Sequence, residues 1–346
     1  MPVINTALCS FGMSGWVFHA PFITTHPGFN LYAVVERSKN LAAEKYPAVK
    51  TFRSVADMLL DDAIELVVVN TPSVTHFELA SKALQAGKHV IVEKPFTATV
   101  AEAEQLIDLA AQKQRLLSVY QNRRWDSDFT TVKNIIASGT LGTIKEAEIH
   151  YDRFTPTLSP KLHKEMPTPA VGILYDLGAH LIDQALQLFG WPQAVFADIA
   201  IYRSNSKVDD YFEILLYYPA MRVRLKATFF AKEPQGYIIH GTKGSFIKSR
   251  ADVQEVALQA HIVPNSEGWG IEPVTESGWA HYEKEGAFVK EQITTATGNY
   301  MKYYDGIYEA LVNKTTAPVT AADAKKVIAI IEAAYKSNAA KRVIIV

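Results

Sequence analysis

Val90-Ile91-Val92-Glu93-Lys94-Pro95 is an apolar run that stops at an ionisable amine and a proline. The apolar part predicts a buried strand, and the proline marks its end. In open α/β sheets, ligands bind outside the carboxyl ends of the strands, which is where this lysine would lie. Lysine is rarely held away from water unless its charge is used. The stretch therefore predicts an α/β sheet with Lys94 at its ligand-binding edge, with a solvated loop lysine as the alternative.

The first 120 residues alternate between short apolar runs and helical patterns. Runs rich in Val, Ile and Leu predict strands at 7–10, 31–35, 66–70, 89–92 and 116–120. Between them, Ser54 and the capping box at 99–102 mark helix starts, and Gly87 marks a helix end. This alternation predicts a parallel sheet with crossover helices over residues 1–121.

Beyond residue 122 the pattern changes to longer runs rich in aromatic and β-branched residues. These runs predict strands at 145–154, 195–203, 211–218, 222–230 and 237–240. Turn residues at 219–220 and 241–244 and the alternation over 222–227 are typical of neighbouring antiparallel strands with one wet face. We expect a second α/β domain over 122–346 with a mostly antiparallel sheet. Its C-terminal helix over 321–336 could pack back on the first domain.

Composition narrows the class of protein. The net charge is −1, so no broad basic field exists to bind nucleic acid or an acidic membrane. Cys9 is the only cysteine, which excludes a disulfide within the chain. No secretory signal and no apolar run of membrane-spanning length are visible. We therefore expect a cytoplasmic protein with no nucleic-acid or membrane partner.

A glycine turn follows the first predicted strand. It runs Ser10-Phe11-Gly12-Met13-Ser14-Gly15 and matches the dinucleotide fingerprint except that serine replaces the first glycine. Glycines in this turn let the backbone approach a pyrophosphate at a helix N-terminus. An ordinary strand–helix turn is the alternative, but the position after the first strand of an alternating region favours cofactor binding.

Glu36-Arg37-Ser38 ends the second predicted strand and bears on the choice of cofactor. An acidic residue here would hold the ribose 2′-hydroxyl of NAD, whereas arginine accommodates the 2′-phosphate of NADP. Arg37 and Ser38 together could bind a phosphate through charge-assisted hydrogen bonds. The pattern favours NADP and leaves NAD open.

Further candidates lie at the other strand ends. Those expected to contact the cofactor are Asn70, Thr71, Pro72, His76, Glu93, Lys94, Pro95 and Asn122. Beside an oxidised nicotinamide, the ammonium form of Lys94 would be disfavoured by like charge and desolvation. Such an amine can orient a hydroxyl or help to take its proton.

Asp176 and His180 stand one helical turn apart, in a stripe that continues through Asp183. Spacing alone favours the wet face of an amphipathic helix. The chemical alternative is a carboxylate–imidazole pair that moves a proton. A His/Asp pair without further ligands does not predict a metal site. Arg123, Tyr151 and Arg153 could supply donors and an apolar wall to a polyol, or could form ion pairs in the core.

Taken together, these residues resemble the Gfo/Idh/MocA oxidoreductase family over nearly the whole chain. The resemblance rests on the glycine turn, on Glu93-Lys94-Pro95 and on Asp176-Leu177-Gly178-Ala179-His180. The segments 18–21 and 122–126 are similar to its NADP-dependent scyllo-inositol dehydrogenase branch.

The resemblance implies an N-terminal Rossmann domain and a C-terminal α/β domain whose large open sheet forms a homodimer or homotetramer. It implies a cis Lys94–Pro95 peptide and a catalytic pair of Lys94 and His180, with Asp176 contacting substrate or positioning His180. The expected activity is hydride transfer between NADP or NAD and a secondary alcohol or ketone of a sugar or inositol. A non-catalytic cofactor-binding sensor and an NAD-dependent glycosidase that oxidises transiently are the alternatives.

Overall fold

The computed structural model describes residues 2–161, 164–233 and 235–346, and the chain divides into two compact units. The first unit contains Met1–Asn122 together with two later segments, Gln254–Trp269 and Asn299–Lys325. The second contains Arg123–Val253, Gly270–Gly298 and Lys326–Val346. Each unit has its own sheet.

The first unit is built on a six-stranded parallel sheet in the order β3-β2-β1-β4-β5-β6. Its strands are β1 Ile4–Leu8, β2 Phe29–Val35, β3 Lys50–Phe52, β4 Leu66–Val69, β5 His89–Glu93 and β6 Leu117–Tyr120. All four residues of β4 are buried, as expected for a central strand covered on both faces. This is the strand order of a dinucleotide-binding Rossmann domain, which confirms the predicted fold class.

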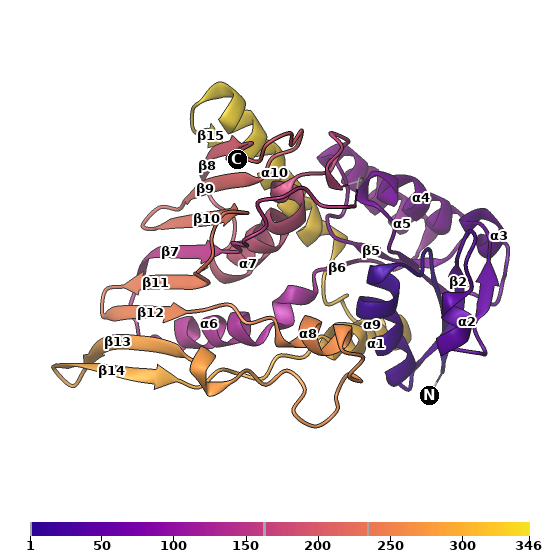
Figure 1. The fold of residues 1–346 in the computed structure, drawn as a ribbon, viewed down its shortest axis with the longest axis horizontal. Coiled ribbons are helices and arrows are strands. Elements are labelled where there is room, and N and C mark those ends of the chain that lie inside the picture. The colour runs from indigo at the N-terminus through magenta and orange to yellow at the C-terminus, as the bar shows by residue number, and fades with distance from the viewer. Residues whose placement is uncertain (1, 162–163, 234) are drawn as a thin grey trace. The chain divides into compact units, whose positions relative to one another are not determined.

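Helices cover both faces of this sheet. α4 (His76–Gln85) and α5 (Val100–Lys113) pack together on one side of β5 and β6, with α1 (Ala20–Thr25) and α9 (Met301–Val312) on the other (Figure 1). The Thr99 capping box at the start of α5 is present, with the Thr99 hydroxyl accepting from the Glu102 N–H. Two short helices, α2 (Leu41–Lys45) and α3 (Val55–Leu59), complete the unit, and Ser54 caps α3 as predicted.

The later segments enter the core of the first unit through aromatic side chains. Tyr304 of α9 stacks on Phe22 with ring centroids 5.8 Å apart and nearly parallel planes. His261, in the loop after α8 (Val253–Gln259), stacks on Trp16 at 5.2 Å. Trp269 packs edge-on against Phe22. The N-terminal core is thus completed by chain that is distant in sequence.

The second unit holds a nine-stranded sheet in the order β14-β13-β12-β11-β7-β10-β9-β8-β15. Its strands are β7 Ile144–His150, β8 Ala194–Ala200, β9 Tyr211–Tyr217, β10 Arg222–Thr228, β11 Tyr237–Gly241, β12 Gly244–Lys248, β13 Gly278–Lys284, β14 Ala287–Ile293 and β15 Ile344–Ile345. β7 and β10 pair in parallel, and the other pairs are antiparallel. The prediction of a mostly antiparallel sheet is confirmed.

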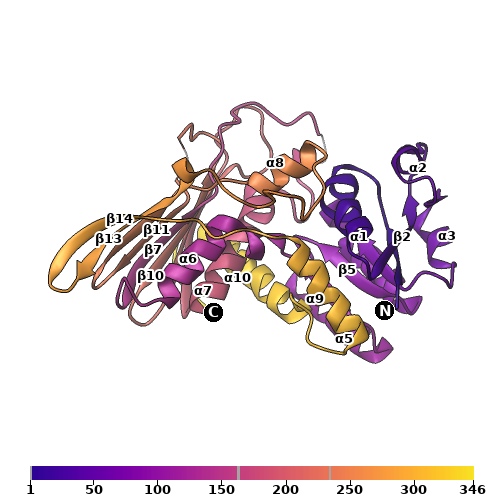
Figure 2. The same ribbon diagram turned by 90° about the horizontal axis from the view of Figure 1, so that it is seen from below.

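The two faces of this sheet differ. α6 (Ser127–Ala137) and α7 (Ala179–Phe189) pack on one face, as Figure 2 shows. A row of aligned side chains crosses the other face. It runs Phe196, Leu215, Arg224, Glu148, Ile238, Ile247, Trp279 and Gln292. Ile247 and Trp279 in this row are 46% and 47% exposed.

Several features differ from the sequence predictions, which did not include strands β12 to β15. β3 was not predicted, since its three residues are too short to form a recognisable apolar run. The C-terminal helix, α10, spans Ala321–Ala340 rather than 321–336, and the boundary between the units falls after Lys325 within it. Among the described residues, no helix is both long and apolar enough to span a bilayer.

Candidate functional site

The glycine turn is fastened to the end of β4. The side chain of Asn70 accepts from the Ser10 N–H at 3.0 Å and donates to the Ser10 carbonyl at 2.8 Å. The Ser10 hydroxyl donates to the Asn70 carbonyl at 2.9 Å. A Cβ on Gly15 would lie 2.6 Å from the Ser10 carbonyl oxygen, so a side chain does not fit there. Serine at position 10 therefore preserves the turn and adds a hydrogen bond to it.

The space around the turn fits a dinucleotide. A Cβ on Gly12 would meet no atom within 4 Å, so the backbone there is open to a ligand. Helical residues follow the turn, and free N–H groups at a helix start bind phosphate. Gln121 follows β6, and its Oε1 is buried with no hydrogen-bond partner in the described part of the chain. A bound amide or hydroxyl could satisfy that oxygen.

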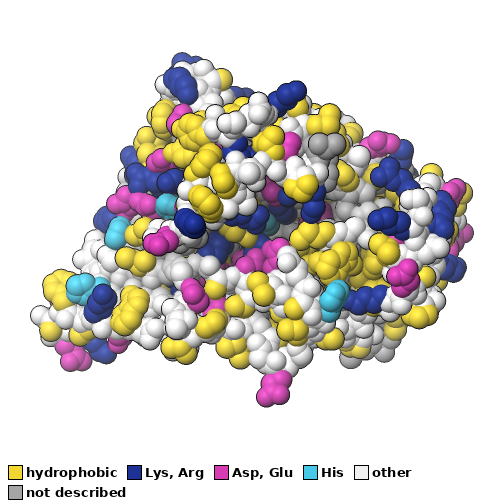
Figure 3. All heavy atoms as spheres, in the orientation of Figure 1, with side chains coloured by type: hydrophobic (Ala, Val, Ile, Leu, Met, Phe, Trp, Pro, Cys, Tyr) yellow, Lys and Arg dark blue, Asp and Glu magenta, His cyan; other side chains and the backbone are white. Residues whose placement is uncertain are grey.

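The loop after β2 separates its acidic and basic residues. Glu36 is buried, and its two carboxylate oxygens accept from the N–H groups of Leu41 and Ala42, both at 3.0 Å. Arg37 and Ser38 are exposed. Lys and Arg side chains are scattered over the outer part of the first unit near α2 and α3 (Figure 3). The carboxylate is therefore used to start α2, and the exposed loop is basic.

His76 joins two strand ends rather than pointing its nitrogens outward. Its Nδ1 lies 2.8 Å from the Pro95 carbonyl and its Nε2 lies 2.9 Å from the Thr71 carbonyl. Burial lowers the pKa of this histidine, so a neutral ring donates to one carbonyl at a time. The ring holds the 71–72 and 94–95 turns side by side at the carboxyl edge of the sheet.

Glu93 accepts several hydrogen bonds at this edge. Its carboxylate accepts from Ser14 of the glycine turn, from His19 Nε2 at 2.9 Å and from the Lys94 N–H at 3.2 Å. Burial alone would raise the pKa of Glu93, but the contacts with His19 and Ser14 outweigh it and leave that pKa lowered. The following Lys94–Pro95 peptide is cis, which confirms that expectation.

His19 and Tyr304 were not predicted as site residues. His19 ends the π-helical turn η1 (Gly15–His19), and its Nδ1 lies 2.6 Å from the Tyr304 hydroxyl. The sequence pattern 18–21 contributed to the family resemblance, but it assigned no task to His19. Tyr304 gave no signal, because it lies 285 residues further along the chain.

In the second unit, Asp176 and His180 belong to different kinds of helix. Asp176 lies in a π-helical turn, η5 (Leu174–Gly178), and pairs with Lys164 at 3.0 Å. His180 is only 4% exposed and lies in α7, with its ring 6.3 Å from that of Tyr151. Asp183 is buried against Arg124 at 2.7 Å. The interpretation of this stripe as a wet helix face is therefore wrong for His180 and Asp183, which are both buried.

Buried charges surround Tyr151. The guanidinium groups of Arg123, Arg153 and Arg250 lie about its ring at 5.1, 5.2 and 4.7 Å. Arg123 bonds to Asp252 at 2.6 Å and approaches Asp126 at 3.4 Å. Arg123 is buried, whereas Arg153 is exposed. Of the predicted substrate-binding arginines, Arg153 is thus the one whose guanidinium is open to solvent.

Asp126 lies in a crowded group of carboxylates. Burial, together with the neighbouring charges of Asp128 and Asp252, raises the pKa of Asp126 from 3.8 to about 8, although Arg123 and Arg250 oppose the change. Two buried carboxyl groups and the partly buried Asp252 face two guanidinium groups here, so one carboxyl can keep its proton near neutral pH.

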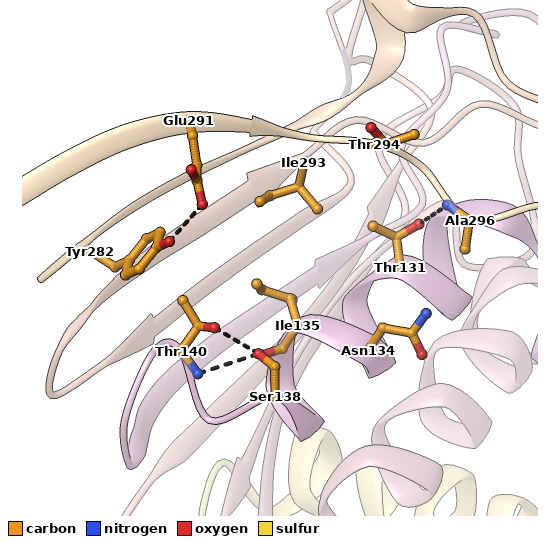
Figure 4. A pocket seen from close by; sticks show the side chains of 10 residues that line it. All are labelled: Thr131, Asn134, Ile135, Ser138, Thr140, Tyr282, Glu291, Ile293, Thr294 and Ala296. Carbon is orange, nitrogen blue, oxygen red and sulfur yellow. Dashed lines mark hydrogen bonds between the residues drawn. The ribbon is translucent and has the colours of Figure 1, made fainter. Parts of the chain in front are cut away.

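One pocket lies apart from all the predicted residues (Figure 4). It has a volume of about 250 Å³ between α6 and the β13–β14 hairpin, and Thr131, Tyr282 and Glu291 are among its lining side chains. Within the described ranges, no group of three or more His, Cys, Asp or Glu side chains could hold a metal ion.

Comparisons with known proteins match both units. A family model described as the NAD-binding Rossmann fold of an oxidoreductase family matches residues 4–121, and one described as an oxidoreductase C-terminal alpha/beta domain matches 133–346. An uncharacterized oxidoreductase of Schizosaccharomyces pombe is 39% identical, over 98% of each chain. The scyllo-inositol 2-dehydrogenase (NADP(+)) IolW of Bacillus subtilis is 38% identical, over 99% of this chain and 95% of its own. A crystal structure of an oxidoreductase from Bacillus cereus matches with TM-score 0.91 at 35% identity, over 99% of both chains.

Asp126 should make stability depend on pH. Because its pKa is raised on folding from 3.8 to about 8, the folded chain retains a proton that the unfolded chain releases. The stabilisation is complete below the lower value and is lost as pH rises through the upper one. Replacing Asp126 with Asn should therefore flatten the fall in the free energy of unfolding between about pH 5 and about pH 8. Urea titrations at both pH values measure this, with exposed Asp62→Asn as the control. An identical pH dependence in D126N and wild type would contradict the assignment.

Proposed function

The chain belongs to the Gfo/Idh/MocA family of oxidoreductases, and on that premise we propose that it transfers hydride between NADP and a secondary alcohol or ketone of a sugar or inositol. The observation that carries the proposal is Lys94 directly after β5, where Glu93 is hydrogen-bonded to Ser14 of a glycine turn that is open at Gly12. Together they offer a dinucleotide site with an amine at the reactive end.

The loop after β2 supports NADP over NAD. A free carboxylate at position 36 would bind a ribose 2′-hydroxyl and repel a 2′-phosphate. Glu36 is instead bonded to the start of α2, while Arg37 and Ser38 are exposed. A relative, the B. subtilis scyllo-inositol 2-dehydrogenase, is named for NADP(+). Arg37 would bind the phosphate charge, with Ser38 donating a further hydrogen bond.

Two side chains would act directly in the reaction. When bound, NADP supplies a hydride acceptor or donor at the nicotinamide ring. Lys94 orients the hydroxyl oxygen of the alcohol, and His180 takes its proton as the carbonyl forms. Asp176 contacts the substrate or orients His180, and it also pairs with the exposed side chain of Lys164. Exposed Arg153 and the ring of Tyr151 would bind the polyol.

Two other functions make different predictions. A sensor that kept the cofactor site would bind NADP but would not reduce it with any polyol. A glycosidase that oxidises transiently would retain its cofactor through purification without net reduction. Reduced-nicotinamide absorbance over a panel of inositols and sugars separates the three.

Lys94→Ala should abolish most of the turnover and spare cofactor binding. Loss of a positioned acid–base group lowers rates by roughly 10²–10⁴-fold. Cofactor binding should be spared because the residues proposed to bind the cofactor phosphates are in the glycine turn and the loop after β2. Turnover is followed by cofactor absorbance and NADP binding by calorimetry. Exposed Lys82, which pairs with Glu78 in α4, gives the control variant Lys82→Ala. Undiminished turnover in K94A would exclude the proposed chemistry.

Arg37→Ala should weaken NADP binding without affecting NAD. A lost charge-assisted hydrogen bond reduces affinity by roughly tenfold or more. Calorimetric titration of both cofactors measures the change in their ratio, with exposed Lys113→Ala as the control. Equal weakening of NADP and NAD would show that Arg37 does not read the 2′-phosphate.

We also propose that the chain assembles as a homodimer or homotetramer through the exposed face of the nine-stranded sheet. Phe196, Ile247 and Trp279 lie along one aligned row of that face and are all substantially exposed. Apolar side chains gathered on one face are typical of an interface. Arg224 and Glu148, paired in the middle of the row, would give the contact a polar centre.

Ile247→Lys should therefore break the assembly, since a charge placed in the apolar part of this interface is costly to desolvate. Light scattering after size-exclusion chromatography should show a smaller species than wild type. Leu60, 80% exposed in the first unit, provides the matched control Leu60→Lys. A monomeric wild type, or an unchanged mass in I247K, would refute assembly through this face.

A further inference from the structure

The carboxylate of Glu93 is held by donors from three places in the first unit. Ser14 comes from the glycine turn, His19 from η1, and the Lys94 N–H from the turn after β5. Its side chain is only 13% exposed, and that of His19 is fully buried. A buried carboxylate is costly unless donors replace its water, and here they do. The charge of Glu93 is therefore both retained and fixed in position.

Tyr304 fixes the orientation of His19. Burial raises the pKa of Tyr304 well above 10, so its hydroxyl keeps its proton and can donate to His19 Nδ1. His19 Nε2 then carries the ring proton and donates to the Glu93 carboxylate. The three side chains form one directed series of hydrogen bonds that ends on Glu93.

This series cannot serve as a proton path to solvent. Tyr304 is fully buried, stacked on Phe22 and packed edge-on against Tyr303. The ring of His19 also lies against Tyr120, 4.6 Å between centroids. The far end of the series is closed by aromatic rings, so the arrangement suits holding a charge rather than moving a proton.

We infer that Glu93 is a fixed negative charge that favours the oxidised nicotinamide over the reduced one, and that His19 and Tyr304 are positioning residues for its carboxylate. The inference rests on the proposed function. Glu93 directly precedes Lys94 at the carboxyl end of β5, the edge at which the reactive end of the cofactor would bind. The oxidised ring is positively charged and the reduced ring is neutral, so a carboxylate near it distinguishes the two.

The consequence is a shift in the equilibrium between the oxidised and the reduced cofactor when it is bound to the protein. Tighter binding of the oxidised form lowers the reduction potential of the bound couple. Hydride then passes more readily from the reduced cofactor to a ketone than it would without the carboxylate. The chain would thus be adapted to reduce a carbonyl as well as to oxidise an alcohol.

The test compares affinities for the two redox forms rather than turnover. Dissociation constants for oxidised and reduced NADP are measured separately by calorimetry on the full chain. Glu93→Gln should weaken the oxidised form relative to the reduced form by about tenfold, since it removes the charge and nearly preserves the shape. Exposed Glu78→Gln in α4 is the matched control and should leave the ratio as in wild type.

Tyr304→Phe provides a second variant that keeps the ring stack with Phe22. Without the hydroxyl donor, the His19 ring can adopt its other tautomer, and the ratio should move in the same direction by about threefold. A purely structural contribution would weaken both redox forms equally and leave the ratio unchanged, which would overturn the inference. If wild type binds neither form, the proposed function fails, and the inference fails with it. If both forms bind and only the ratio is insensitive, the inference alone fails.

Discussion

The first unit depends on keeping the carboxylate of Glu93 charged in a place with little water. A buried carboxylate needs several donors, and a single strand end cannot supply them. The donors come from the glycine turn and from η1, and Tyr304 of α9 fixes His19 in turn. Satisfying one charge therefore ties the phosphate turn, the Lys94 turn and a late helix to the same edge of the sheet.

The second unit must also satisfy charges that are held away from water, and there several carboxylate and guanidinium groups lie together. Arg123 and Arg250 lie among Asp126, Asp128 and Asp252, close to the ring of Tyr151. Such a cluster is stable only if each charge finds a partner or is neutralised by a proton. Its packing around Tyr151 leaves Arg153 exposed and His180 buried beside it. The ring of Tyr151 therefore lies among two buried guanidinium groups and one exposed guanidinium group.

Much of the fold could be predicted because the signals are local. The buried runs of β4 and β5, the Thr99 capping box and the turn at Gly87 all depend on residues close in sequence. β3 was missed because three residues are too few to show the apolar periodicity that predicts a strand. The stripe containing His180 was misread because periodicity shows which residues share a helix face but does not show which faces are covered. Here His180 and Asp183 are both buried.

The sequence by itself determined the α/β class, the glycine turn, the Lys94 strand end and the resemblance to a family. Each of these depends on residues that are close together in the sequence. Only the tertiary structure decided that Glu36 starts α2 and leaves the basic loop exposed. Only the tertiary structure brought Tyr304 to His19 across 285 residues of chain. The physical reason is the same in both cases. A buried polar group takes whichever partner the folded chain brings within hydrogen-bond reach, and that partner need not be near in sequence.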